Sequence, residues 1–135
     1  ALADGTIDAI CSDHTPVDED QKQLPFSEAE SGATGLELLL PLTLKWAAEE
    51  KLPLAKALAR ITSDSANVLG IEAGGIEPGA VADICVFDPD VNWTVDRTNL
   101  KSQGRNTPYV GREMQGRARY TIVAGQLAYD GAKSK

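Results

Sequence analysis

The pattern of apolar positions divides the chain into two halves of different character. Residues 7–12 form a short apolar run that predicts a buried strand, and residues 13–34 predict a long polar loop. Helices are predicted over residues 36–50, 54–61 and 64–69, where apolar residues recur at helical spacing. The first half therefore has the pattern of the end of an α/β unit.

Turn and cap residues set the expected boundaries of these helices. Pro41 interrupts the first helix, so we expect a kink or a late start near it. Pro53 suits the first turn of the second helix. Ser63 is expected to cap the third helix, and Gly70 to end it.

In the second half, apolar and polar residues alternate along short stretches, which indicates antiparallel β structure. An Asp-Pro-Asp turn at residues 88–90 is expected to separate two strands, and residues 97–115 are expected to be irregular. Residues 125–126 predict a tight hairpin turn. The predicted strands cover residues 82–87, 92–95, 119–124 and 127–129.

The composition excludes some classes of binding partner and indicates the cellular compartment of the protein. The formal net charge of −7 argues against a nucleic-acid partner. No apolar run approaches the length of a bilayer-spanning helix, so no membrane partner is expected. Cys11 and Cys85 have no metal-binding spacing, and we expect buried thiols in a reducing compartment rather than the alternative, a disulfide between them. The chain opens on an interior strand, so we expect a piece of a longer enzyme.

The candidate chemistry lies at the end of the first predicted strand, in the sequence Ser-Asp-His-Thr. An acid at this position is costly unless it binds something, and the carboxyl ends of parallel strands carry the catalytic groups of barrel enzymes. Asp13 is therefore the first candidate catalytic residue, the alternative being that it caps a turn or a helix. His14 is expected to form structural hydrogen bonds rather than to bind a metal.

Five stretches in this order resemble motifs of the class I dihydroorotases, which belong to the amidohydrolase superfamily. The first two, DAICSDHTP and GATGLE, resemble the family's D-x-I-x-[ST]-D-H-x-P and G-x-x-G-x-E motifs. The third resembles the entry to the family's small β domain, and the last two its closing segment. The stretches are residues 8–16, 32–37, 75–84, 106–111 and 116–125.

The resemblance implies an α/β fold, the C-terminal part of a (β/α)8 TIM barrel with part of a small β-sandwich domain. Residues 1–70 would supply the last strand and the closing helices of the barrel. Residues 71–135 would supply the C-terminal part of the β sandwich. Asp83, in the third motif, is expected to fix a turn.

The resemblance also implies a zinc-dependent site. Asp13 takes the place of the aspartate that contacts the metal and shuttles the proton. The single histidine, His14, cannot build a zinc site, so the other ligands are expected outside this chain. Ser31 and Gly32 take places that offer backbone groups to the substrate. Val17 takes the place of a histidine that contacts the substrate in active enzymes.

The function implied is reversible ring closure of N-carbamoyl-L-aspartate to dihydroorotate, a step of de novo pyrimidine biosynthesis. A cytoplasmic location and a homo-oligomer are expected with it. One alternative is a catalytically silent subunit that assembles with aspartate transcarbamoylase, which Val17 favours. Another is a different cyclic amidohydrolase, an allantoinase or a hydantoinase.

Overall fold

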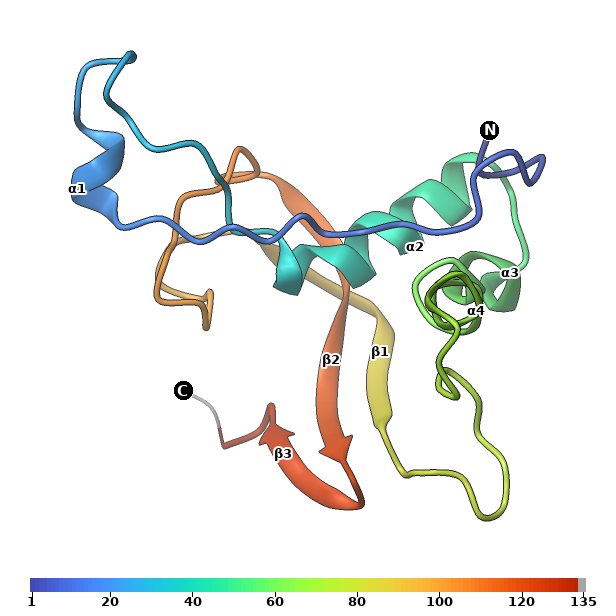
Figure 1. Cartoon of the computed structure of the whole chain (residues 1–135). Helices are drawn as coiled ribbons and strands as arrows, with labels where there is room; N and C mark the ends of the chain where they lie inside the picture. Colours follow the sequence, from blue (N-terminus) through green and yellow to red (C-terminus); the bar gives the residue numbers. More distant parts are fainter. Residues whose placement is uncertain (134–135) are drawn as a thin grey trace.

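The computed structural model describes residues 1–133, with the helices in the first half of the chain and the strands in the second (Figure 1). None of the described helices is long and apolar enough to cross a membrane. The helical elements are α1 (Glu19–Lys22), the 3-10 helix η1 (Leu36–Leu38), α2 (Leu39–Glu49), α3 (Leu54–Ala59) and α4 (Ser63–Leu69). The strands are β1 (Ile84–Thr94), β2 (Glu113–Val123) and β3 (Gln126–Asp130).

The helix boundaries follow the proline and glycine positions. Helix α2 begins at Leu39, so Pro41 lies in its first turn, where a missing N–H is tolerated. This confirms the predicted late start. Gly70 ends α4 in the left-handed conformation at φ 66°, as predicted. The predicted cap is wrong by one residue, because Thr62 is the N-cap of α4 and Ser63 is its first residue.

Residues 7–12 are extended but form no strand, contrary to the prediction (Figure 1). Within residues 1–133, their backbone hydrogen bonds run from the N–H of Ile7 to the Ala1 carbonyl at 3.3 Å and from the N–H of Ile10 to the Arg60 carbonyl at 2.9 Å. A strand needs a neighbouring strand along its length, and none of the described strands lies beside this segment.

The three strands form one antiparallel sheet in the order β1-β2-β3. The predicted break at residues 88–90 is a register shift between Asp88 and Asn92 within a single long strand. Pro89 is tolerated there because β1 is an edge strand of the sheet. Strand β2 begins at Glu113, so the irregular stretch ends before the residue predicted.

Asp83 fixes the turn between β2 and β3, as predicted. Its Oδ1 accepts a hydrogen bond from the N–H of Ala124 at 2.7 Å, and the N–H of Gly125 donates to the Ala82 carbonyl at 3.0 Å. Ala124 and Gly125 have positive φ values of 47° and 79°, so the turn lies at these two residues rather than at residues 125–126.

The buried core lies where α2 packs against β2. Leu38 is fully buried at its centre, and Leu42, Trp93 and Tyr109 pack around the cluster. The other members of the core cluster are Val95, Leu100 and Met114.

The two cysteines lie outside this core, and the prediction that both are buried is wrong. Cys11 and Cys85 are free and exposed. None of the described strands lies beside the segment of Cys11 to cover it, and Cys85 lies on edge strand β1.

An ion pair joins β1 to β2 on an exposed surface, with Arg119 Nη2 at 2.9 Å from Asp88 Oδ2. The Arg119 guanidinium and the backbone N–H of Asp90 hold the pKa of the Asp88 carboxyl below its usual value. A lowered native pKa means that the pair stabilises the fold above the ordinary pKa and that this contribution is lost as the pH falls through the native pKa.

We therefore expect Arg119→Met to raise the pKa of Asp88 toward the ordinary aspartate value. Carboxyl-carbon NMR titration measures this change directly. Arg112→Met removes an arginine whose side chain makes no ion pair within residues 1–133, and it should leave the titration of Asp88 unchanged. The same Asp88 titration curve in Arg119→Met as in the unmodified protein would contradict the assignment.

Candidate functional site

Three irregular segments lie side by side around the candidate catalytic residue. We refer to them as the Asp13 segment (residues 12–17), the Gly32 segment (residues 31–35) and the Asn106 segment (residues 104–107). The N–H of Thr15 donates to the Ala33 carbonyl at 3.0 Å and joins the first segment to the second. The long polar loop therefore returns to the end of the extended segment from which it departs.

The Asn106 segment holds the Gly32 segment from its other side. The N–H of Thr34 donates to the Asn106 carbonyl at 2.6 Å, and Asn106 Nδ2 donates to the Gly32 carbonyl at 3.2 Å. The buried hydroxyl of Thr34 donates to the Gly104 carbonyl. A loop between β1 and β2 thus fixes a loop of the helical half of the chain.

Glycines allow the segments to approach closely. A Cβ on Gly32 would lie 2.6 Å from the Thr15 carbonyl oxygen, and φ at Gly32 is 136°, a value that side-chain-bearing residues rarely adopt. A Cβ on Gly104 would lie 2.7 Å from Pro16 Cβ. The packing of the three segments therefore depends on the absence of side chains at both positions.

Asp13 is exposed at the end of the extended segment and has a positive φ of 44°. Its N–H lies 3.4 Å from Cys11 Sγ, and its carbonyl accepts a hydrogen bond from the Thr15 hydroxyl at 3.3 Å. Within residues 1–133 its carboxylate has no hydrogen-bond or ion-pair partner, so the alternative in which Asp13 caps a turn or a helix gains no support. The carboxylate is free to act on a ligand.

His14 has the structural role that the sequence predicts. Its Nδ1 accepts hydrogen bonds from the N–H groups of Gly35 and Leu36, both at 3.2 Å. These are backbone groups at the start of η1, which would otherwise lack partners. Because Nδ1 is an acceptor, the ring proton lies on Nε2. The residue beside Asp13 is thereby tied to the start of the η1–α2 helical unit.

The predicted substrate-contacting residues lie in the same region with different exposures. Val17 is 6% exposed, and its Cγ2 lies 2.9 Å from the position that a Cβ on Gly32 would take. Gly32 is half-buried and Ser31 is exposed. The structure thus brings Val17 and Gly32 together, and their contact with a substrate stays a prediction.

The described residues fit one ligand of a metal centre rather than a complete site. No group of three or more His, Cys, Asp or Glu side chains within residues 1–133 is placed to hold a metal ion. A catalytic zinc ion takes about three protein ligands. The Asp13 carboxylate, which has no partner in the described part of the chain, is the kind of oxygen donor that zinc accepts, whereas Nδ1 of His14 already accepts two hydrogen bonds.

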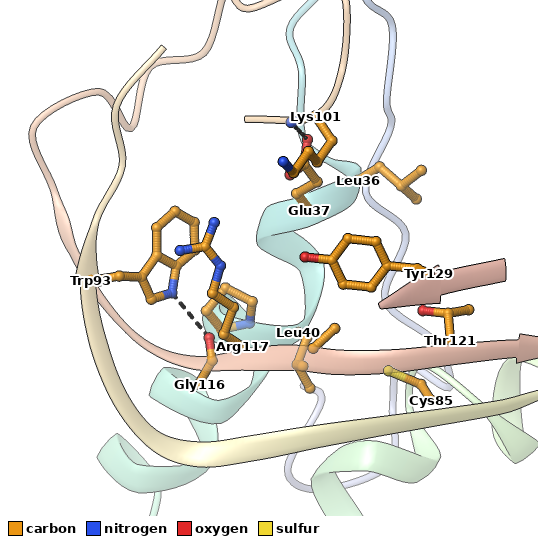
Figure 2. A pocket seen from close by; sticks show the side chains of 12 residues that line it. Leu36, Glu37, Leu40, Cys85, Trp93, Lys101, Gly116, Arg117, Thr121 and Tyr129 are labelled. Carbon is orange, nitrogen blue, oxygen red and sulfur yellow. Dashed lines mark hydrogen bonds between the residues drawn. The ribbon is translucent and has the colours of Figure 1, made fainter. Parts of the chain in front are cut away.

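A cavity of about 300 Å³ lies between the η1–α2 unit and the sheet (Figure 2). The Arg117 guanidinium lies 4.7 Å from the centroid of the Trp93 ring, whose Nε1 donates to the Gly116 carbonyl at 3.0 Å. Cys85 also lines the cavity; its side chain is exposed overall, but the surrounding protein atoms partly desolvate the thiol and raise its pKa. None of the predicted site residues lines this cavity.

Glu37 lies at the rim of this cavity and is part of the predicted G-x-x-G-x-E motif. Its Oε1 accepts hydrogen bonds from the backbone N–H groups of Lys101, at 2.7 Å, and Ser102, at 2.9 Å. The glutamate therefore braces the loop between β1 and β2 against η1.

Sequence reasoning missed the residues that hold the Gly32 segment. Thr34 and Gly104 carry no local signal of a contact between segments 70 residues apart. Asn106 stands out in the sequence only as the first residue of a motif that resembles the closing segment of the family. A motif of this kind indicates that a residue matters without indicating which residue it contacts.

The chain is similar in sequence to known proteins. A family model described as "Amidohydrolase family" matches residues 5–129. The dihydroorotase of Geobacter metallireducens is 46% identical over 129 residues, which are 96% of this chain and 30% of that protein. The dihydroorotase of Pelobacter propionicus is 42% identical over 128 residues, 95% of this chain and 30% of that protein. The chain thus spans about 30% of the length of these relatives.

Solved hydantoinases have the same fold over the part that corresponds to this chain. D-hydantoinase from Thermus sp. superposes with a TM-score of 0.86 at 25% identity, covering 98% of this chain and 30% of that one. L-hydantoinase from Arthrobacter aurescens superposes with a TM-score of 0.78 at 29% identity, covering 96% and 30%. Because the family model spans nearly the whole chain, the chain belongs to the amidohydrolase family.

Proposed function

We propose that the complete polypeptide is a cytoplasmic, homo-oligomeric dihydroorotase that interconverts N-carbamoyl-L-aspartate and dihydroorotate in de novo pyrimidine biosynthesis. The observation that carries the proposal is the exposed carboxylate of Asp13, which lies beside the Gly32 segment and has no partner among residues 1–133. Similarity to curated dihydroorotases, including 46% identity to the protein from G. metallireducens, supports this substrate over a hydantoin or allantoin.

The proposed architecture is the C-terminal part of a (β/α)8 barrel followed by part of a small β sandwich. Residues 1–70 would close the barrel, and residues 71–135 would belong to the sandwich. Residues 7–12 are extended and pair with no strand within residues 1–133, which supports this proposal, because flanking barrel strands would give partners to the backbone groups that lack them. Likeness to the Thermus hydantoinase over 98% of this chain also supports it.

Asp13 acts in this proposal as the proton-transfer group. A bound zinc ion would polarise the ring carbonyl and make water a better nucleophile at neutral pH. In hydrolysis, the Asp13 carboxylate accepts the proton of the attacking water while a bond forms from the water oxygen to the ring carbonyl carbon. Asp13 then donates this proton to the amide nitrogen as the C–N bond breaks. Ring closure runs through the same steps in reverse.

The Gly32 segment binds and orients the substrate in this proposal. Ser31 and Gly32 offer backbone groups, which suit the carboxylate and the ring amide of dihydroorotate. Val17 supplies an apolar contact beneath Gly32, at the place that the family resemblance gives to a substrate-contacting histidine.

A second candidate function is that of a catalytically silent subunit assembling with aspartate transcarbamoylase. The burial of Val17 favours it, because a buried valine cannot donate a hydrogen bond to a substrate. The two candidates differ in whether the complete polypeptide turns over dihydroorotate.

Turnover of four cyclic amides by the complete, zinc-loaded polypeptide tests the proposal. With dihydroorotate, hydantoin, dihydrouracil and allantoin, we expect kcat/KM to be highest for dihydroorotate by about 100-fold or more, because buried polar groups reject analogues that leave them unpaired. A preference for hydantoin or allantoin would contradict the assigned substrate. Absence of turnover with all four substrates would favour the silent subunit.

A further inference from the structure

We propose that Asn106 is a positioning residue that sets the orientation of the Gly32 segment for the substrate, an inference that rests on the proposed function. Asn106 lies on the loop between β1 and β2, outside the part of the chain that carries Asp13. It acts through the backbone of the Gly32 segment and needs no contact with the reacting atoms.

Asn106 makes two hydrogen bonds, one on each side of Ala33. Its Nδ2 donates to the Gly32 carbonyl at 3.2 Å, and its own carbonyl accepts the N–H of Thr34 at 2.6 Å. The Ala33 carbonyl is engaged separately by the N–H of Thr15 at 3.0 Å. Three consecutive residues of the segment are therefore each bonded to a neighbouring segment.

These bonds decide which backbone groups remain for a ligand. Within residues 1–133, the carbonyl of Ser31 and the N–H groups of Gly32 and Ala33 have no hydrogen-bond partner. Polar backbone groups left unpaired in a half-buried segment are the groups a substrate would satisfy.

The bond from Asn106 to Gly32 fixes the direction of one of these groups. The peptide between Gly32 and Ala33 is planar and trans, so the Gly32 C=O and the Ala33 N–H point in opposite directions. Holding the carbonyl on Asn106 turns the Ala33 N–H to the opposite side of the segment. Without this bond, the glycine on the N-terminal side would let the plane rotate, because glycine has wide backbone freedom.

An asparagine is well suited to this position because its side-chain amide donates to Gly32 and its backbone carbonyl accepts from Thr34. Aspartate has the same shape, but it would place an acceptor oxygen against the Gly32 carbonyl oxygen and repel it. Alanine would leave the carbonyl without a partner while keeping the backbone bond to Thr34. The two variants therefore separate loss of the side-chain bond from active repulsion.

Asn99 offers a matched control on the same loop. Its Nδ2 donates to the Thr94 carbonyl at 2.7 Å, and its Oδ1 accepts the N–H of Asp96 at 3.1 Å. These bonds fix a turn that does not touch the Gly32 segment. Asn99→Ala thus removes a comparable side-chain bond without affecting the proposed substrate-binding backbone.

The first measurement is steady-state kinetics of dihydroorotate hydrolysis by the complete, zinc-loaded polypeptide. Asn106→Ala should raise KM about tenfold, which corresponds to about 1.4 kcal/mol of binding. Its kcat should change less than about twofold, because the Asp13 carboxylate is untouched. Asn106→Asp should raise KM further, and Asn99→Ala should leave KM unchanged. An equal change of KM in Asn106→Ala and Asn99→Ala would overturn the proposal.

The second measurement needs no activity and therefore separates failure of this proposal from failure of the proposed function. Hydrogen exchange by mass spectrometry, followed over residues 31–35, should accelerate about tenfold in Asn106→Ala as the segment opens more often. Asn99→Ala should leave exchange over the same residues unchanged. Unaltered exchange in Asn106→Ala would overturn the positioning role even in an active enzyme. Accelerated exchange in an inactive polypeptide would support it and reject only the proposed activity.

Discussion

Replacing Asp13 by asparagine in the complete, zinc-loaded polypeptide is expected to reduce dihydroorotate hydrolysis about 10²–10⁴-fold, the usual contribution of a positioned acid–base group. An amide has nearly the shape of the carboxylate but cannot accept a proton from the attacking water. The effect should fall on kcat, because proton transfer belongs to the reaction step and not to binding. Initial rates measured over a range of dihydroorotate concentrations check this.

The backbone conformation of Asp13 suits asparagine as well as aspartate, so the substitution changes the carboxylate without straining the backbone. Asparagine tolerates the positive φ of 44° at this position, so the fold should persist in the variant. Asp18→Asn is the matched control, since Asp18 is an exposed carboxylate in the same loop without a cap hydrogen bond. We expect it to retain full activity. Comparable activity in Asp13→Asn and Asp18→Asn would remove Asp13 from the mechanism.

Replacing Gly32 by alanine should have the second-largest effect. The new Cβ would lie 2.6 Å from the Thr15 carbonyl oxygen and 2.9 Å from Val17 Cγ2, at a φ of 136°. Backbone strain costs about 1–3 kcal/mol, and overpacking adds a similar amount. Urea-induced unfolding should show this loss as a lower midpoint with an unchanged slope. Substrate binding should weaken as well, because the Gly32 segment moves away from Thr15.

Gly111→Ala is a control that separates the cost of backbone strain from the cost of steric overlap. Gly111 has a positive φ of 79°, but a Cβ there would meet nothing within 4 Å. Gly111→Ala should therefore cost only the strain of about 1–3 kcal/mol and leave substrate binding unchanged. If Gly32→Ala destabilises the protein no more than Gly111→Ala does, the close contact with Thr15 is not important for the fold.

Elements with strong local signals could be predicted from the sequence. Helix α2 begins late because of Pro41, and α4 ends at Gly70 because glycine adopts the left-handed conformation readily. The β2–β3 hairpin was predicted from Gly125. In each case the residue that decides the structure lies within the element or next to it, so local chemistry suffices.

The strand predicted over residues 7–12 was wrong because an apolar run does not specify its neighbours. Strand pairing needs a second strand, and within residues 1–133 the strands β1, β2 and β3 pair only with one another. The exposure of Cys11 follows from the same missing neighbours. The prediction that the Asp-Pro-Asp sequence separates two strands was wrong for a different reason. An edge strand tolerates Pro89, and the strand continues through a register shift.

In the candidate site, too, residues with a local sequence signal could be predicted and residues joined by long-range contacts could not. Asp13 is a candidate because it follows a short apolar run, and Gly32 because it lies in a motif that resembles a known family; each signal is contained in a few adjacent residues. The hydrogen bonds of Thr34 and Asn106 join segments far apart in the sequence, and no periodicity or local propensity encodes such a pair. Only the folded chain brings these residues to the Gly32 segment.

The separation of 70 residues between Thr34 and Gly104 has a consequence for biosynthesis. At roughly 5–20 residues per second, a ribosome that has added Thr34 needs about 4–14 s more to add Gly104. During this interval the Gly32 segment lacks its buried partner, and its backbone groups are available to chaperones and proteases. A nascent chain stalled before residue 104 would therefore display this segment without its partner, and the buried hydrogen bond of Thr34 can form only after residue 104 has been added.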